Sequence, residues 1–91
     1  MKTSKHVIVR GKVQGVFFRD YTRRQAVKEN LTGWVRNLPD GSVEALFSGE
    51  EKYLSAMLNW LKQGSPQSRV DSIHVDDLIP DENYTTFEIR Y

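Results

Sequence analysis

The order in which two hydrophobic periodicities follow one another along this chain of 91 residues constrains its fold more than any other feature. Apolar and polar residues alternate, as in half-buried strands, in segments 6–13, 32–38, 42–47, 69–79 and 84–91. Apolar residues recur at helical spacing in segment 18–30 and again after residue 48. These segments predict the order βαββαβ, in which the last strand is either whole or split in two.

Residues typical of turns and helix ends support this order. Pro39-Asp40-Gly41 is typical of a tight turn between two antiparallel strands. Ser48 and Glu51 have the spacing of a capping box at the start of the second helix, and Gly64 is placed to end that helix. The apolar stripe of this helix contains Leu54, Met57, Leu58 and Leu61. The pattern predicts an α+β fold, the ferredoxin-like α/β sandwich, whose antiparallel sheet of four or five strands carries both helices on one face.

Composition excludes several kinds of site. The chain has no cysteine, which excludes disulfides, thiolate metal sites and a cysteine nucleophile. No apolar run is long enough for a membrane span or a signal peptide, so we expect a cytoplasmic protein with no membrane partner. The length predicts that residues 1–91 form a single domain, and we expect a monomer.

Charge is distributed unevenly along the chain. Residues 1–36 hold nine Lys and Arg against two acidic residues, a net charge of +7, whereas residues 37–91 hold four against ten, a net charge of −6. A basic half could attract small anions or nucleic acid, or could simply form solvated faces. Asp20 and Glu29 interrupt the basic run on the first predicted helix, which weakens the nucleic-acid interpretation.

The segment Gly11–Arg19 joins the first strand to the first helix and is the best candidate for a binding site. A loop with glycines at both ends can present successive backbone N–H groups to an anion, and the following helix N-terminus adds further free donors. Arg19 contributes a planar, permanently charged group that suits two oxygens of a phosphate or carboxylate. The glycine spacing alone favours a plain structural turn over an anion site.

Three motifs resemble the acylphosphatase family of small stand-alone enzymes, and the resemblance covers nearly all of the chain to its Arg90-Tyr91 ending. The motifs are Gly11-x-Val13-Gln14-Gly15-Val16-x-Phe18-Arg19, Gly33-Trp34-Val35-x-Asn37 and Asp40-Gly41-x-Val43-Glu44. The resemblance implies that Arg19 binds the phosphoryl group of an acyl phosphate, that Asn37 positions a water molecule, and that no cofactor or metal takes part. It also implies that loop amides hold the remaining phosphoryl oxygens, namely those of Gly11, Lys12, Val13, Gln14, Gly15, Val16 and Phe17.

The residue types in these motifs agree with that chemistry. Neither the loop nor the segment around Asn37 contains a histidine or carboxylate that could protonate a leaving group. A phosphomonoester would need such a donor, but an acyl phosphate releases a carboxylate whose conjugate acid has a pKa of about 4. We therefore expect in-line attack by water without a phospho-enzyme, with inorganic phosphate as product and competitive inhibitor.

Other candidates are weaker. His6 and His74 have no carboxylate or second histidine at ligand spacing, so both are expected to be ordinary surface histidines, and Asp76-Asp77 is expected to form a solvated edge. Leu38 stands where a hydroxyl could have supported Asn37, so backbone contacts would have to orient that side chain. The terminal carboxylate of Tyr91 is a candidate partner for Arg19.

Two other functions remain open for such a chain. One is a non-catalytic adaptor module that binds acyl or carbamoyl phosphates. The other is a ferredoxin-like RNA-binding domain, although the strands lack the stacking aromatic residues of that class. We therefore expect a small-molecule substrate and no nucleic acid.

Overall fold

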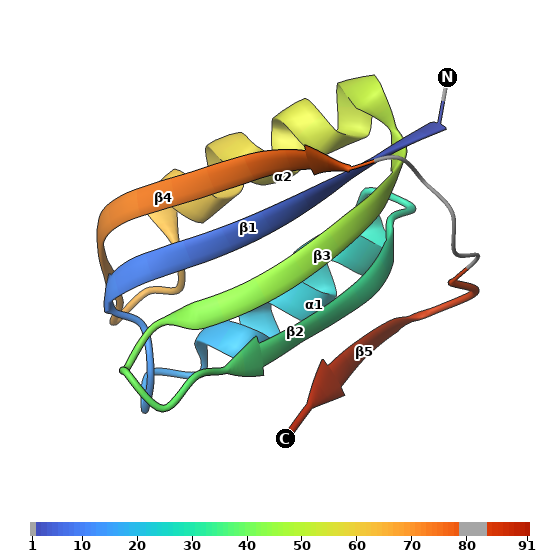
Figure 1. Ribbon diagram of the computed structural model, residues 1–91. Coiled ribbons are helices and arrows are strands. Elements are labelled where there is room, and N and C mark those ends of the chain that lie inside the picture. Colours follow the sequence, from blue (N-terminus) through green and yellow to red (C-terminus); the bar gives the residue numbers. More distant parts are fainter. Residues whose placement is uncertain (1, 79–83) are drawn as a thin grey trace.

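The computed structural model describes residues 2–78 and 84–91. It consists of a five-stranded sheet with both helices on one face (Figure 1). The strand order across the sheet is β4-β1-β3-β2-β5. This arrangement confirms the predicted ferredoxin-like α+β fold. In chain order the elements are β1 (Lys2–Lys12), α1 (Phe18–Lys28), β2 (Thr32–Asn37), β3 (Val43–Glu50), α2 (Glu51–Gln63), β4 (Arg69–Leu78) and β5 (Phe87–Arg90).

The sheet is mixed rather than wholly antiparallel. β1 pairs antiparallel with β3 and β4, and β2 pairs antiparallel with β3, as expected, but β5 lies parallel to β2. The predicted last strand is split into β4 and β5, which occupy opposite edges of the sheet. Because no hairpin joins β5 to its neighbour β2, nothing forces an antiparallel direction on this pair.

The cross-strand ladder extends two strands beyond their predicted ends. β1 begins at Lys2 rather than at residue 6, and β3 continues to Glu50, because these two residues pair with each other at the end of the ladder. The predicted capping box was therefore wrong. Ser48 lies within β3, where its hydroxyl is 3.0 Å from the Ser4 hydroxyl, and the N-cap of α2 is Glu50 with no side-chain cap bond. Strand pairing has overridden the local helix-start pattern.

The core lies between the sheet and the two helices. Each helix buries one stripe: Phe18, Thr22 and Ala26 from α1, and Leu54, Met57 and Leu61 from α2. The inward faces of the strands meet these stripes, as the alternation predicted, with Val7 and Val9 fully buried. No helix in the described part of the chain is long and apolar enough to cross a bilayer.

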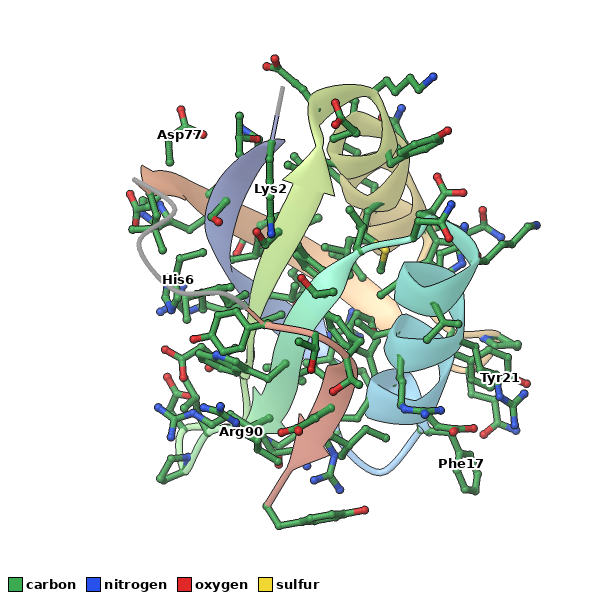
Figure 2. All side chains as sticks on the ribbon, turned by 90° about the vertical axis from the view of Figure 1, so that its right-hand side faces the viewer. Lys2, His6, Phe17, Tyr21, Asp77 and Arg90 are labelled. Atoms are coloured by element: carbon green, nitrogen blue, oxygen red, sulfur yellow. The ribbon has the colours of Figure 1, made fainter. Side chains whose placement is uncertain are left out.

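The other face of the sheet carries polar and aromatic side chains, among them His6 and Arg90 (Figure 2). The sequence showed no carboxylate at ligand spacing from His6, but the sheet supplies one from another strand, because His6 Nε2 lies 2.7 Å from Glu44 Oε2 on β3. Glu44 also accepts a hydrogen bond from Arg36. Burial of Glu44 raises the pKa of its carboxyl, but the bonds with His6 and Arg36 outweigh this effect and hold that pKa below its ordinary value.

His74 also has a carboxylate neighbour that the sequence reasoning missed. It lies 3.2 Å from Asp76, two residues further along β4 and on the same face of the strand. Both side chains are exposed, so they form a surface pair. Exposed pairs of this kind contribute little to stability.

Candidate functional site

The loop between β1 and α1 has an unusual backbone. Gly11 sits at a bulge in β1 with φ 136°, and a Cβ at this position would lie 2.1 Å from the Arg69 carbonyl oxygen of β4. Gly15 has φ 74°, and Phe17, the N-cap of α1, has φ 59° and ψ 25°. Left-handed residues of this kind turn the chain sharply and can make successive N–H groups converge.

The N–H groups of this loop have no partner among residues 2–78 and 84–91. In the part of the chain that the structure describes, none of the backbone N–H groups of residues 14–17 donates a hydrogen bond. The loop continues directly into α1, whose first-turn N–H groups also lack intrahelical acceptors. Together they form a set of free donors beside a helix N-terminus, the arrangement that suits an anion.

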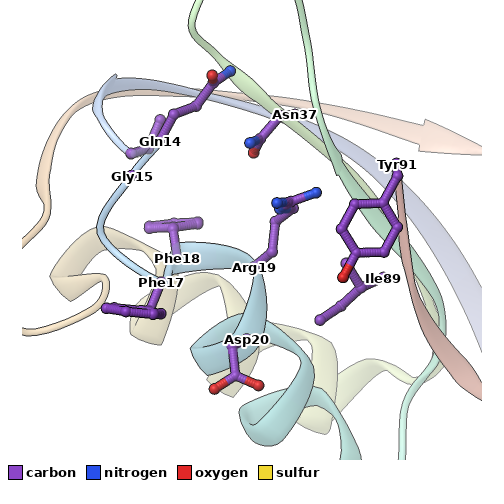
Figure 3. Close-up of a pocket in the computed structure, with 10 residues that line it drawn as sticks. Gln14, Gly15, Phe17, Phe18, Arg19, Asp20, Asn37, Ile89 and Tyr91 are labelled. Atoms are coloured by element: carbon purple, nitrogen blue, oxygen red, sulfur yellow. The ribbon is translucent and has the colours of Figure 1, made fainter.

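A pocket of about 470 Å³ lies against this loop (Figure 3). It is bounded by the loop, the first turn of α1, the end of β2 and the C-terminal strand. The residues that line it are Val13, Gln14, Gly15, Phe17, Phe18, Arg19, Asp20, Asn37, Ile89 and Tyr91. The structure thus brings Arg19 and Asn37, 18 positions apart in the sequence, to one pocket.

Three of the seven predicted loop residues do not line this pocket. Gly11 and Lys12 lie in β1, where they pair with Val70 and Arg69 of β4. Val16 is buried beneath the loop, and its carbonyl oxygen accepts a hydrogen bond from the Ser65 hydroxyl. Gly11 and Lys12 are thus held in the sheet, and the loop N–H groups that have no partner among the described residues are those of residues 14–17.

Arg19 carries a positive charge that no carboxylate neutralises within residues 2–78 and 84–91. Its Nη1 donates to the Arg90 carbonyl oxygen at 3.3 Å, and its Cζ lies 4.7 Å from the centre of the Tyr91 ring. The predicted pairing with the terminal carboxylate is not among the contacts of the described residues. The neighbouring Asp20 forms an ion pair with Arg24 instead, at 2.8 Å. The C-terminal segment therefore orients Arg19 and leaves its charge available to a ligand.

Asn37 presents the opposite situation, an acceptor without a donor. Its Oδ1 is buried and has no hydrogen-bond partner in the described chain. Figure 3 shows the Asn37 amide directed into the pocket, on the side toward Arg19. A buried polar atom left without a partner costs about 1–3 kcal/mol, so a water or ligand in the pocket would be stabilised by this oxygen.

Comparison with known proteins places this geometry in a family. The sequence model of the acylphosphatase family matches residues 5–89. The chain belongs to the acylphosphatase family. It is 51% identical over 85 residues to an acylphosphatase of a Synechococcus species, with 93% of this chain and 89% of that protein covered. It is 42% identical to an acylphosphatase of Geotalea uraniireducens over the full length of both.

A solved structure supports the same assignment. The crystal structure of acylphosphatase from Bacillus subtilis superimposes on this chain with a TM-score of 0.95 at 41% identity, and each chain is covered completely. The family resemblance seen in the sequence is thereby confirmed. The roles of individual residues are a separate matter and are argued from the geometry of the site.

A side-chain bridge that the sequence reasoning missed fixes this acylphosphatase site. Gln14 Nε2 donates to the carbonyl oxygens of Leu38 and Ser42, both at 2.8 Å. These two residues flank the turn that follows Asn37, so Gln14 ties the loop to the strand end that carries Asn37. The sequence indicated only the backbone amide of Gln14, because nothing local reveals a contact 24 positions away.

Backbone contacts hold the turn that follows Asn37. The Leu38 N–H donates to the Ser42 carbonyl at 2.9 Å, and the Gly41 N–H donates to the Leu38 carbonyl at 3.1 Å. The hydroxyl and the N–H of Ser42 both donate to Asp40, and these bonds hold the pKa of the Asp40 carboxyl below its ordinary value. The end of β2 is therefore well supported without a hydroxyl at position 38.

The described residues contain no cluster of three or more histidine and carboxylate side chains that could hold a metal ion. Ile89 lines the pocket but was not predicted to do so. Tyr91 was expected to meet Arg19 through its terminal carboxylate, whereas its ring makes the contact. Both residues reach the site through the parallel pairing of β5 with β2, which no local sequence pattern indicates.

Proposed function

We propose that this chain hydrolyses acyl phosphates to a carboxylate and inorganic phosphate, by direct attack of a water molecule held by Asn37 on a phosphoryl group held by Arg19 and the loop amides. The observation that carries the proposal is that one pocket holds two groups: the Arg19 guanidinium, which no carboxylate of the described residues neutralises, and Asn37 Oδ1, which has no hydrogen-bond partner among them. The activity agrees with the names of the relatives, because the proteins that match nearly all of this chain are acylphosphatases.

Binding of the phosphoryl group follows from the free donors. The N–H groups of residues 14–17 and the start of α1 offer fixed dipoles, and Arg19 offers two parallel N–H bonds to a pair of oxygens. Three phosphoryl oxygens share the negative charge in a loose transition state. Preorganised donors that face this charge typically contribute about 10²- to 10³-fold each to the rate.

Asn37 positions the water molecule that acts as the nucleophile. Its Oδ1 accepts one O–H bond from a water molecule, which leaves a lone pair of that water free to face phosphorus. The bond from the water oxygen to phosphorus forms as the bond to the acyl oxygen breaks. The electron pair leaves with the carboxylate, and the proton of the water passes to phosphate or solvent.

The groups around the pocket favour an acyl phosphate over a phosphomonoester. The side-chain carboxylate among the lining residues is that of Asp20, which pairs with Arg24 and is not a free proton donor. A leaving group must therefore depart unprotonated, which a carboxylate does readily because the pKa of its conjugate acid is about 4. An alkoxide would leave far more slowly.

The simplest form of the proposal is a single-domain monomer that acts in the cytoplasm on a small diffusible substrate. It needs neither cofactor nor metal, and it binds neither nucleic acid nor membrane. Inorganic phosphate, which fits the same donors as the substrate, is expected to inhibit competitively.

The experiment is benzoate release from benzoyl phosphate in excess chelator, with p-nitrophenyl phosphate as the substrate that has a poor leaving group. We expect rapid turnover of benzoyl phosphate alone, and a loss of about 10²-fold or more in Arg19→Ala and Asn37→Ala. Arg69→Ala and Asn59→Ala, which remove the same groups from exposed positions that do not line the pocket, are the matched controls and should retain the activity.

Two results would overturn parts of the proposal. Full activity of Asn37→Ala would remove the water-positioning role of Asn37. A folded wild-type protein that releases no benzoate, but binds phosphate at the loop, would instead favour the non-catalytic adaptor.

A further inference from the structure

Phe17 is an unusual residue for the rim of a phosphate site. Its side chain is 72% exposed, although it is large and apolar. Its backbone is left-handed, with φ 59°, a conformation that bulky residues rarely adopt. Strain of this kind tends to occur at functional sites. The loop geometry explains the backbone, but it does not explain why an aromatic side chain is held in solvent.

A second hollow begins at this ring. It has a volume of about 220 Å³ and is lined by Val16, Phe17, Tyr21, Pro66 and Gln67. Phe17 lines this hollow and also the phosphate pocket, so the two spaces meet at its ring. Tyr21 follows one helical turn after Phe17, and Figure 2 shows both side chains on the same side of the molecule, directed away from its body.

The chemistry of the reaction places the leaving group toward this second hollow. In an in-line displacement, the attacking and leaving oxygens lie on opposite sides of phosphorus. Figure 3 shows Asn37 at the upper side of the pocket and Phe17 at its lower left, with Phe18 between them in this view and Arg19 on the side toward Tyr91. A water held by Asn37 therefore directs the acyl group of the substrate toward Phe17.

We propose that Phe17, Tyr21 and Pro66 form the subsite for the acyl group, and that this subsite favours flat aromatic acyl phosphates over small ones. The inference rests on the proposed function. Planar acyl groups can stack on exposed rings. The five lining side chains are uncharged. The nearby Arg24 guanidinium, 5.2 Å from the centre of the Tyr21 ring, is already paired with Asp20, so the lining favours uncharged, apolar substituents.

The Tyr91 ring is the competing candidate. It also lines the phosphate pocket, but it already packs against the Arg19 guanidinium, with 4.7 Å between Arg19 Cζ and the ring centre. It lies with Ile89 on the β5 side of the pocket, away from Phe17 (Figure 3). Its contact with Arg19 assigns it to orientation of the guanidinium rather than to the acyl group.

The test compares kcat/KM for benzoyl phosphate and acetyl phosphate in wild type, Phe17→Ala and Tyr21→Ala. A disturbed phosphate loop would slow both substrates alike and so cancels in the ratio of the two values. We expect the benzoyl-to-acetyl ratio to fall about three- to tenfold in Phe17→Ala and less in Tyr21→Ala. Val27→Ala, which truncates an exposed apolar residue of α1 that does not line either hollow, is the matched control.

The outcomes distinguish a failure of the proposed subsite from a failure of the proposed activity. Turnover of both substrates with an unchanged ratio in Phe17→Ala and Tyr21→Ala would overturn the subsite and leave the proposed function standing. Loss of the preference in Tyr91→Ala instead would place the acyl group at the C-terminal side and would equally overturn it. No turnover of either substrate by folded wild type would overturn the proposed function, and the subsite with it.

Discussion

Replacement of Gln14 by methionine tests whether a single side chain couples the loop to the strand end that carries Asn37. Methionine has a similar length and no donor, so Gln14→Met removes both hydrogen bonds to the Leu38 and Ser42 carbonyl oxygens and little else. The two bonds are the only side-chain link between the loop and this turn among the described residues. Their loss should affect both stability and catalysis.

The magnitude follows from the remaining partners of the two carbonyl groups. The Leu38 carbonyl still accepts from the Gly41 N–H, and the Ser42 carbonyl still accepts from the Leu38 N–H. Neither oxygen is orphaned, so the cost is that of two ordinary hydrogen bonds, each about 0.5–1.5 kcal/mol. We expect Gln14→Met to lower the free energy of unfolding by about 2 kcal/mol. A loosened Asn37 should also lower kcat by roughly tenfold, since misplacement by 1 Å can cost about 10²-fold.

Urea unfolding and the rate of benzoyl phosphate hydrolysis measure the two effects separately. The matched control is Gln63→Met, which makes the same change at an exposed position in the last turn of α2. The reasoning is refuted if Gln14→Met unfolds at the same urea concentration as wild type and turns over substrate at the same rate. A loss of stability with an unchanged kcat would show that the bridge holds the turn but does not position Asn37.

Three further predictions concern the loop backbone and a buried carboxylate. Gly11→Ala should lower the free energy of unfolding by more than about 3 kcal/mol, because its Cβ would lie 2.1 Å from the Arg69 carbonyl oxygen. Gly15→Ala, which has φ 74° but open space around the Cβ, should cost only about 1 kcal/mol, and equal costs in urea unfolding would contradict the clash. Phe17→Gly should raise the thermal midpoint, because the left-handed backbone costs about 1 kcal/mol in phenylalanine; a lower midpoint would show that the exposed ring stabilises the fold. The Glu44→Gln variant should lose less of its free energy of unfolding than wild type as the pH falls. The folded pKa of Glu44 lies below its ordinary value of 4.5, so the stability it contributes is present above that pH and is lost as the pH falls through the folded pKa. Urea unfolding at about pH 6 and about pH 3 measures this, and parallel behaviour of variant and wild type would exclude the contribution.

Local periodicity predicted the order and the inward faces of the elements, because the spacing of apolar residues within a strand or helix determines which of its faces is buried. Val7 and Val9 alternate with polar residues and are buried, and Leu54 and Leu61 belong to the buried stripe of α2. What the sequence did not predict depends on residues far apart in the chain. The parallel pairing of β5 with β2 and the extension of β3 through Ser48 are set by strand partners rather than by local patterns.

The site shows the same division. The glycine-bracketed loop and Arg19 stand out chemically in the sequence, but the choice between a structural turn and an anion site came from family resemblance rather than from spacing. Gly11 has a structural role, because the absence of a Cβ allows the β4 backbone to pack closely against it. The Gln14 bridge and the contact of Tyr91 with Arg19 link residues 24 or more positions apart, so no local pattern could reveal them.

The location of oxygen-18 after hydrolysis of benzoyl phosphate in labelled water tests the central claim most directly. Attack of the Asn37-held water on phosphorus forms the new oxygen bond at phosphorus, so mass spectrometry should find the label in inorganic phosphate and none in benzoate. Label in benzoate would show that water attacks the carbonyl carbon. The phosphoryl group would then not be the reacting centre, and the assigned roles of Arg19 and Asn37 would be contradicted.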